Sequence, residues 1–214
     1  MHAFPVIDLF AGPGGLGEGF SSIGREFNKP AFDIRLSIEN DPNAYNTLLL
    51  RTFYREFPTY EKPEYYYNHI RGELSREQLF GSYPEESKAA NNKVWLATLG
   101  EIPADEVDMR IRNSITENMP WVLIGGPPCQ AYSTVGRSRI GGVNPDDPRV
   151  FLYREYLRII AMHAPPVFVM ENVKGILSSR IGNDLIFKQI LSDLQARAAT
   201  VRKFKGNQQK KIKD

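Results

Sequence analysis

The feature that most constrains the fold is a glycine-rich turn between a short apolar run and a stretch with helical spacing. Residues 6–10 form the apolar run, and Gly12, Gly14 and Gly17 follow it in the pattern Gly-x-Gly-x-x-Gly. Glu39 ends the next apolar run, 22 residues after Gly17. Glycines let a backbone pass close to a ligand, and a carboxylate there can accept hydrogen bonds from ribose hydroxyls. The pattern predicts a nucleoside-like cofactor but does not choose between NAD and an adenosyl compound.

Short apolar runs alternate with helical patterns along the chain. Such alternation predicts an α/β fold with a doubly wound, mostly parallel sheet of the Rossmann-like type. A chain of 214 residues is long enough for one sizeable domain of this kind. We expect strands at 6–10, 34–38, 121–124 and 167–170, and helices that begin near Leu16, after a cap at Asn40 or Asp41, at 150–163 and at 183–197.

The stretch from 57 to 118 is the least regular part of the chain. It is longer than a plain crossover between two strands, and its helix-like pieces lie at 85–98 and 104–113. We therefore expect a mostly helical insertion at about 57–118 within a single domain that spans 1–201. The run Tyr65-Tyr66-Tyr67 is expected to pack internally more than to stack on bases.

Charge is distributed unevenly. Residues 202–214 hold six basic side chains and one acidic one, a net of +5, so the remaining 21 basic and 24 acidic residues have a net of −3. We interpret this basic tail as disordered, with a phosphate-binding arm as the alternative. One cysteine excludes an internal disulfide, and no signal-like or membrane-spanning apolar segment is evident. We expect a soluble, cytoplasmic protein without a metal site.

The single cysteine, Cys129, lies in the loop Gly125-Gly126-Pro127-Pro128-Cys129-Gln130, directly after a predicted strand. Ligands of open α/β sheets bind at the carboxyl ends of strands, so this thiol could be a nucleophile. A free cysteine is also commonly a small buried hydrophobe. Glu171 ends another predicted strand, where a carboxylate often only caps a helix or pairs with a cation. The local patterns alone leave these alternatives open.

Three segments taken together, Asp8-Leu9-Phe10-Ala11-Gly12-Pro13-Gly14-Gly15, Gly126-Pro127-Pro128-Cys129-Gln130-Ala131-Tyr132-Ser133 and Met170-Glu171-Asn172-Val173, resemble the cytosine-C5 DNA methyltransferase family. The resemblance implies an S-adenosylmethionine-dependent methyltransferase fold and S-adenosyl-L-methionine as the cofactor. It implies that the Cys129 thiolate adds to C6 of a cytosine flipped out of double-stranded DNA, while Glu171 binds the N3 and amino edge of the base. A restriction–modification setting is implied as well.

The same resemblance assigns further residues. The implied cofactor contacts are Phe10, Ala11, Gly12, Gly14, Leu16, Glu39, Gly126, Pro128 and Leu152. The implied substrate contacts are Gln130, Ser133, Arg137, Arg139 and Asn172, several of them in a glycine- and arginine-containing loop expected to close over the site. The family also uses an acidic residue to contact the adenine amino group. Residues 113–116 fit that role weakly, and we leave it unassigned.

The resemblance breaks off after the third segment. The family's Gln-x-Arg-x-Arg segment, target-recognition region and late helix have no counterpart here, and Gln195 and Arg197 imitate the first of these by coincidence. Either a second polypeptide supplies these parts or the gene is truncated, and in both cases we expect little activity of the chain alone. The alternatives are a tRNA cytosine-C5 methyltransferase, a folded non-catalytic fragment and an NAD-binding oxidoreductase.

Overall fold

The computed structural model describes residues 2–24, 29–58, 61–115, 119–127, 152–172, 180–181 and 184–185, and parts of 187–196. The strands are β1 (Phe4–Leu9), β2 (Phe32–Glu39), β3 (Val94–Leu96), β4 (Val122–Gly125), β5 (Val167–Met170), β6 (Arg180–Ile181) and β7 (Asp184–Leu185). The helices are α1 (Gly15–Ser22), α2 (Pro42–Glu56), α3 (Glu64–Ile70), α4 (Arg76–Ser82), α5 (Pro84–Lys93), α6 (Ala104–Ser114) and α8 (Leu152–His163).

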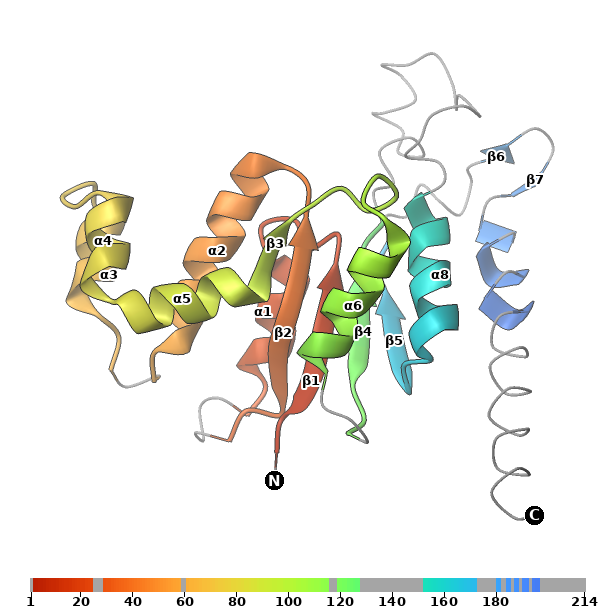
Figure 1. Ribbon diagram of the computed structural model, residues 1–214, viewed down its shortest axis with the longest axis horizontal. Coiled ribbons are helices and arrows are strands. Elements are labelled where there is room, and N and C mark those ends of the chain that lie inside the picture. The colour runs from red at the N-terminus through yellow and green to blue at the C-terminus, as the bar shows by residue number, and fades with distance from the viewer. Residues whose placement is uncertain are drawn as a thin grey trace.

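The central sheet has five strands in the order β3-β2-β1-β4-β5 (Figure 1). All four pairings between neighbours are parallel, and β6 and β7 form a separate antiparallel pair. The strand order reverses between β1 and β4, so this is the topological switch point at which open α/β sheets bind ligands. The predicted doubly wound, mostly parallel sheet is confirmed.

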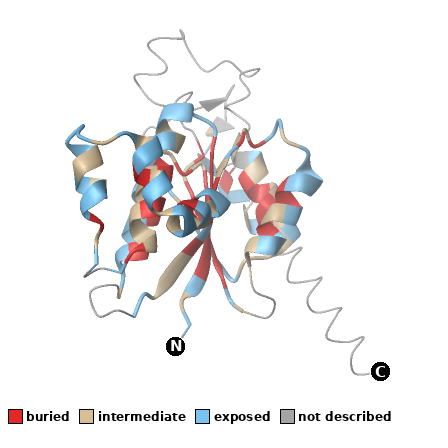
Figure 2. Ribbon diagram, turned by 60° about the vertical axis from the view of Figure 1, so that its left-hand side comes forward, coloured by how far each residue is buried: buried red, intermediate tan, exposed pale blue. Residues whose placement is uncertain are grey.

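Helices cover the sheet on both faces. Helices α6 and α8 lie in front of the sheet in Figure 1 and pack Ile111, Tyr156 and Ile159 against Ile7 and Leu9. Helix α1 lies behind the sheet. There Leu16 and Phe20 pack against residues of β1, β2 and β4 that point to this face, namely Val6, Ile34, Val122 and Ile124. Figure 2 shows the buried residues concentrated on the strands and on the helix sides that face them. Strand residues alternate between the two faces, as the period of two requires.

A helical layer beside α2 forms a second core. Phe53 packs edge-on against Phe57, with ring centroids 5.1 Å apart, and lies 4.8 Å from Phe80 of α4. Of the tyrosine run, Tyr66 packs on Tyr54 at 4.4 Å, whereas Tyr65 and Tyr67 remain exposed. Helices therefore dominate this stretch, and α6 corresponds to the helix-like piece expected at 104–113.

Two sequence predictions about element boundaries are wrong. The helix expected at 85–98 ends at Lys93, and the chain passes directly into β3, which pairs with β2 at the sheet edge. Backbone pairing at this edge outweighs the neutral helix propensity of the segment. The helix expected to begin at 183 does not include Asp184 or Leu185, because these form β7, although described residues between 187 and 196 are helical. The basic tail at 202–214 lies outside the described residues. Within the described part of the chain, no helix is long and apolar enough to cross a membrane.

Candidate functional site

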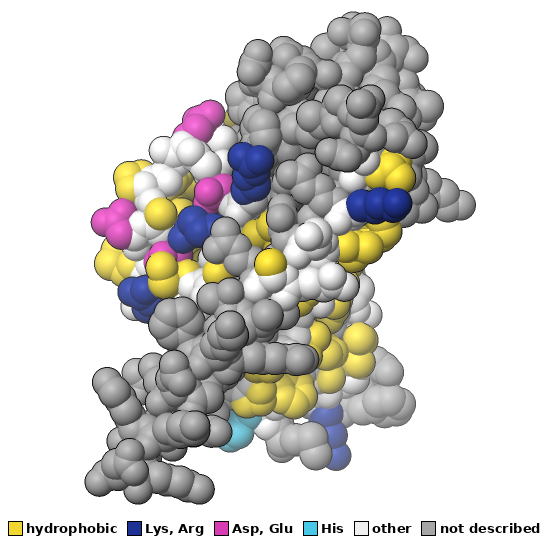
Figure 3. Space-filling view, turned by 90° about the vertical axis from the view of Figure 1, so that its right-hand side faces the viewer, with side chains coloured by type: hydrophobic (Ala, Val, Ile, Leu, Met, Phe, Trp, Pro, Cys, Tyr) yellow, Lys and Arg dark blue, Asp and Glu magenta, His cyan; other side chains and the backbone are white. Residues whose placement is uncertain are grey.

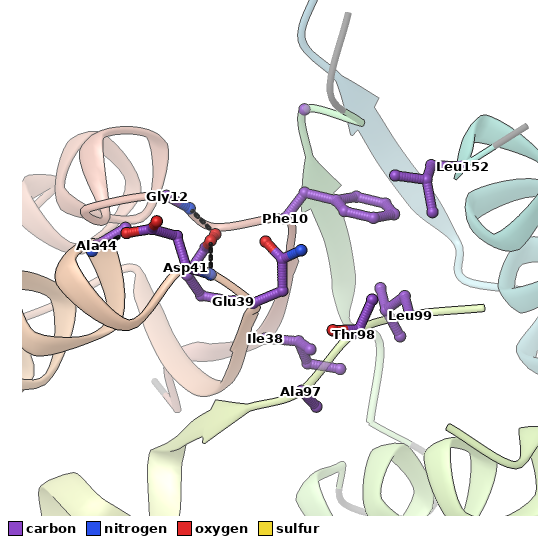
Figure 4. A pocket seen from close by; sticks show the side chains of 12 residues that line it. Phe10, Gly12, Ile38, Glu39, Asp41, Ala44, Ala97, Thr98, Leu99 and Leu152 are labelled. Carbon is purple, nitrogen blue, oxygen red and sulfur yellow. Dashed lines mark hydrogen bonds between the residues drawn. The ribbon is translucent and has the colours of Figure 1, made fainter. Parts of the chain in front are cut away.

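A cavity of about 350 Å³ opens at the carboxyl ends of the strands beside the switch point (Figure 4). Its walls come from the last residues of β2, from the segments that follow β1, β2, β3 and β4, and from the first turns of α2 and α8. This volume lies within the range of small-molecule sites. The lining residues are Phe10, Gly12, Ile38, Glu39, Asn40, Asp41, Ala44, Ala97, Thr98, Leu99, Gly126 and Leu152.

Glu39 connects two walls of this cavity. Its Oε2 accepts a hydrogen bond from the Gly12 amide at 2.7 Å, and its Oε1 accepts one from the Asp41 amide at 2.8 Å. The residue is 8% exposed. A buried carboxylate with an amide donor on each oxygen is held in one orientation, and each oxygen keeps acceptor capacity for a ligand hydroxyl.

Asp41 begins α2 as the sequence predicted. Its carboxylate accepts hydrogen bonds from the amides of Asn43 and Ala44 at 2.9 and 2.8 Å, and Pro42 occupies the first turn. This cap fixes the direction in which α2 leaves the cavity. The hydrogen bonds that Glu39 accepts from Gly12 and Asp41, together with the Asp41 cap, hold this edge of the cavity in one conformation.

The glycine turn takes backbone conformations that favour glycine. Gly12 has a φ of 56° and Gly14 a φ of 88°. A Cβ on Gly14 would lie 2.8 Å from Leu48 of α2, so glycine there permits close packing of the turn on that helix. Gly12 has open space where its Cβ would lie and instead faces the cavity.

The predicted cofactor residues divide into three groups. Phe10, Gly12, Glu39, Gly126 and Leu152 line the cavity. Ala11, Gly14 and Leu16 do not line it, because Ala11 and Leu16 pack into the two cores behind the turn and Gly14 contacts Leu48. Pro128 lies outside the described residues.

The end of β4 approaches its neighbours closely. The amide of Glu171 donates to the Gly125 carbonyl at 2.9 Å, which continues the ladder between β4 and β5 by one residue. A Cβ on Gly126 would lie 2.7 Å from Glu171 Oε2. The predicted base-binding carboxylate therefore lies beside a residue of the cavity wall, and its side chain is exposed at the surface.

The other predicted site residues are less defined. Asn172 follows Glu171 and is half-buried. Cys129, Gln130, Ser133, Arg137 and Arg139 lie outside the described residues, so their roles remain predictions. Among the described residues, no group of three or more His, Cys, Asp and Glu side chains could hold a metal ion.

Some lining residues were not assigned by the sequence reasoning. Ala97, Thr98 and Leu99 follow β3, which was missed as a strand, so their place at the strand ends could not be predicted. Asn40 and Asp41 follow Glu39 directly and were interpreted only as helix caps. Asn113 and Ser114, the weak alternative for the adenine contact, line a different shallow hollow with Glu106 and Arg110 on α6. They do not line the Glu39 cavity.

Asp8 is a buried carboxyl close beneath the glycine turn. It is 1% exposed, and neither of its oxygens has a hydrogen-bond partner among the described residues. A Cβ on Gly17 would lie 2.9 Å from Asp8 Oδ2, so glycine there leaves room for the carboxyl. Burial raises the pKa of Asp8 to about 7; the charge of Arg55 lowers it, and that of Glu39 raises it.

The fold and the site define an open α/β protein with a nucleoside-sized cavity at the switch point of a parallel sheet. The profile of the C-5 cytosine-specific DNA methylase family matches residues 89–197. The chain therefore belongs to the C-5 cytosine-specific DNA methylase family.

Curated relatives agree with this family. The Type II methyltransferase M.Bpa9945I of Bacillus paralicheniformis is 35% identical over 194 residues, which covers 83% of this chain and 42% of that protein. The Type II methyltransferase M.AquIA of a Picosynechococcus species is 31% identical over 180 residues, 84% of this chain and 52% of that protein. The chain thus spans about half the length of these relatives. Among solved structures, the Entamoeba histolytica methyltransferase EhMeth aligns at 19% identity with a TM-score of 0.47, over 92% of this chain and 44% of that one.

Proposed function

We propose that this chain carries the cofactor-binding and catalytic part of a DNA cytosine-C5 methyltransferase that uses S-adenosyl-L-methionine. One observation carries the proposal: the Glu171 carboxylate lies beside Gly126, and Gly126 lines the same cavity as Glu39. The carboxylate proposed to bind the base and the cavity proposed to bind the cofactor thus lie at neighbouring strand ends. Cys129 is only three residues beyond Gly126 in the sequence.

The cavity residues suit an adenosyl group. Glu39 would accept hydrogen bonds from the ribose hydroxyls through the acceptor sites that the Gly12 and Asp41 amides leave free. Ile38, Leu99 and Leu152 offer apolar surface for a flat base. When bound, the cofactor supplies an electrophilic methyl group on a sulfonium.

The chain's own residues would prepare cytosine for that methyl group. The Cys129 thiolate would form a bond to C6, which makes C5 nucleophilic, while Glu171 holds the N3 and amino edge of the base. After C5 gains the methyl group it loses its proton, and the bond between sulfur and C6 breaks to regenerate the thiolate. S-adenosyl-L-homocysteine is the other product.

Double-stranded DNA is the proposed substrate, as the DNA methylase family implies. A duplex hides C6 of cytosine, so the base must be flipped out to bring C6 to a thiol. Gln130, Ser133, Arg137, Arg139 and Asn172 would contact the flipped base and its phosphates. The Type II methyltransferase names of both relatives support a restriction–modification role, which we propose the protein performs in the cytoplasm. A tRNA substrate is the alternative within the same chemistry.

The exposed side chains of strand β5 indicate that additional polypeptide packs against this strand. Val167, Phe168 and Val169 are 52%, 39% and 38% exposed, although strands of parallel sheets are usually covered on both faces. Figure 3 looks onto this side of the molecule and shows hydrophobic side chains gathered on its surface. We infer that polypeptide corresponding to the remaining half of the relatives, in the same chain or in a second one, covers β5 and carries target recognition.

Calorimetry and methyl transfer test the proposal. We expect S-adenosyl-L-homocysteine to bind the chain, NAD not to bind, and Glu39→Gln to weaken binding at least tenfold. With the C-terminal half of a relative such as M.Bpa9945I added, tritiated methyl groups should enter duplex DNA and not tRNA. Binding of NAD without binding of the homocysteine compound would contradict the proposal.

A further inference from the structure

We propose that the Thr98 hydroxyl contacts the six-position of the cofactor's purine, and that this makes the site tolerant of a 6-oxo purine in place of adenine. The inference rests on the proposed function, because it names which part of the cofactor meets this wall of the cavity. It concerns a residue that the sequence left unassigned.

The sheet places Thr98 next to Glu39. Leu96, the last residue of β3, pairs with Glu39 of β2, and the Ala97 amide donates to the Glu39 carbonyl at 2.9 Å. Thr98 follows, and its carbonyl accepts hydrogen bonds from the amides of Glu101 and Ile102 at 3.1 and 3.2 Å. These backbone contacts fix the segment. A ligand whose ribose contacts Glu39 can therefore extend its base along a defined wall.

Figure 4 shows what surrounds this wall. The Phe10 ring and Leu152 lie on one side of the cavity, and Thr98 and Leu99 lie on the other. Ile38 lies beneath, between Glu39 and the β3 segment. Apolar groups thus form most of this end of the cavity, as expected for a slot that holds a flat heterocycle.

Thr98 is the uncommitted polar side chain that the segment after β3 contributes to the cavity. The Glu39 carboxylate accepts two amide hydrogen bonds, and the Asp41 carboxylate accepts two more at the start of α2. Asn40 lines the cavity but is exposed to solvent. The Thr98 hydroxyl has no hydrogen-bond partner among the residues that the structure describes. A base that extends along the segment after β3 would bring its polar edge to this hydroxyl.

The chemistry of a hydroxyl sets the specificity. It can accept a hydrogen bond from the 6-amino group of adenine, and by rotating it can donate one to the 6-oxo group of hypoxanthine. A carboxylate at the same place could only accept, and would reject the oxo group. From the segment that follows β3, only Ala97, Thr98 and Leu99 line the cavity, so none of its acidic side chains does. The contact at the six-position should consequently discriminate weakly between the two purines.

The test titrates the full chain with S-adenosylhomocysteine and with S-inosylhomocysteine by calorimetry. We expect the two dissociation constants of the wild type to agree within about fivefold. Thr98→Asp should retain the adenosyl compound and weaken the inosyl compound at least tenfold relative to it. Thr98→Val should weaken both about three- to tenfold, and Thr98→Ser should restore both.

Thr47→Val is the matched control, because the Thr47 hydroxyl bonds the Asn43 carbonyl at 3.2 Å on the exposed side of α2. It should leave both constants unchanged. If the wild type binds the adenosyl compound but rejects the inosyl compound by more than about fiftyfold, or if Thr98→Val changes neither constant, the role of Thr98 is overturned while the cofactor proposal stands. If the wild type binds neither compound, both proposals fail.

Discussion

The Glu39 carboxylate accepts a hydrogen bond from the Gly12 amide at 2.7 Å, across 27 residues of sequence. This bond joins the glycine turn after β1 to the end of β2, and the second oxygen joins the same carboxylate to the start of α2. The residue proposed to hold the cofactor ribose is therefore also a structural brace. A substitution of Glu39 should therefore weaken both ligand binding and the stability of this part of the fold.

Glu39→Gln tests this dual role. A glutamine presents an NH₂ group to one of the two amides, so one donor loses its acceptor in a buried place. We expect the free energy of unfolding to fall by about 1–3 kcal/mol, measured by urea denaturation. Glu73→Gln, which alters an exposed ion pair with Arg71, is the control and should change stability by less than about 0.5 kcal/mol. If Glu39→Gln and Glu73→Gln lowered the free energy of unfolding equally, the structural role of Glu39 would be contradicted.

Gly125 and Gly126 should respond differently to alanine. A Cβ on Gly125 would clash with the Leu9 carbonyl oxygen and lie 3.0 Å from the Tyr156 ring, so strand β1 or α8 would have to move. We expect Gly125→Ala to lower the free energy of unfolding by about 3 kcal/mol.

Among the described residues, the one tight contact of a Cβ on Gly126 is with the end of the Glu171 side chain, which is exposed and can turn away. Gly126→Ala should leave stability within about 1 kcal/mol and reduce reaction with cytosine, because Glu171 is displaced. Urea denaturation separates the two variants. A Gly126→Ala protein as unstable as Gly125→Ala would show that this contact is part of the core.

Asp8 should make stability decrease as the pH rises. Its folded pKa of about 7 lies above the ordinary value near 4, so the folded state binds the proton more tightly than the unfolded state between these values. Stability from this group is complete below about pH 4 and is lost as the pH rises through 7. The loss between pH 5 and pH 8 amounts to roughly 2–3 kcal/mol.

Asp8→Asn removes this titration. Urea denaturation at pH 5 and pH 8 should show the variant gaining stability relative to the wild type by that amount at the higher pH. A difference between the two proteins that is independent of pH would contradict the buried, unpaired state of the carboxyl.

Asp108 should act in the opposite direction. Burial would raise its pKa, but hydrogen bonds from Arg158 and His163, both at 2.9 Å, hold the pKa of Asp108 below its usual value. Its contribution is therefore present above about pH 4 and is lost as the pH falls through the folded pKa. Asp108→Asn should cost about 2–4 kcal/mol at pH 7, because it loosens α6 from α8 and leaves the Arg158 charge without its buried partner. Glu155→Gln, which changes the outer partner of Arg158, is the control and should cost less than about 1 kcal/mol.

Sequence patterns predicted much of this fold because the signals were local. The apolar runs, the glycine turn and the Asp41 cap each act within a few residues, and the strands built on them pair in parallel as alternation required. Strand β3 was missed because its three residues follow α5 without a break, and only pairing with β2 makes them a strand. Thr98 was missed for the same reason. Its place in the cavity depends on that long-range pairing, which no local pattern encodes.

The central claim concerns Cys129 and is tested most directly with duplex DNA that contains 5-fluorocytosine. Fluorine cannot leave C5 as a proton does, so a thiol that has added to C6 stays attached after methyl transfer. With cofactor and the C-terminal half of a relative present, we predict a covalent protein–DNA adduct that survives denaturing electrophoresis, far less of it with Glu171→Gln, and none with Cys129→Ala. An adduct that persists in Cys129→Ala, or a wild-type complex that methylates ordinary DNA yet is never trapped, would contradict the account.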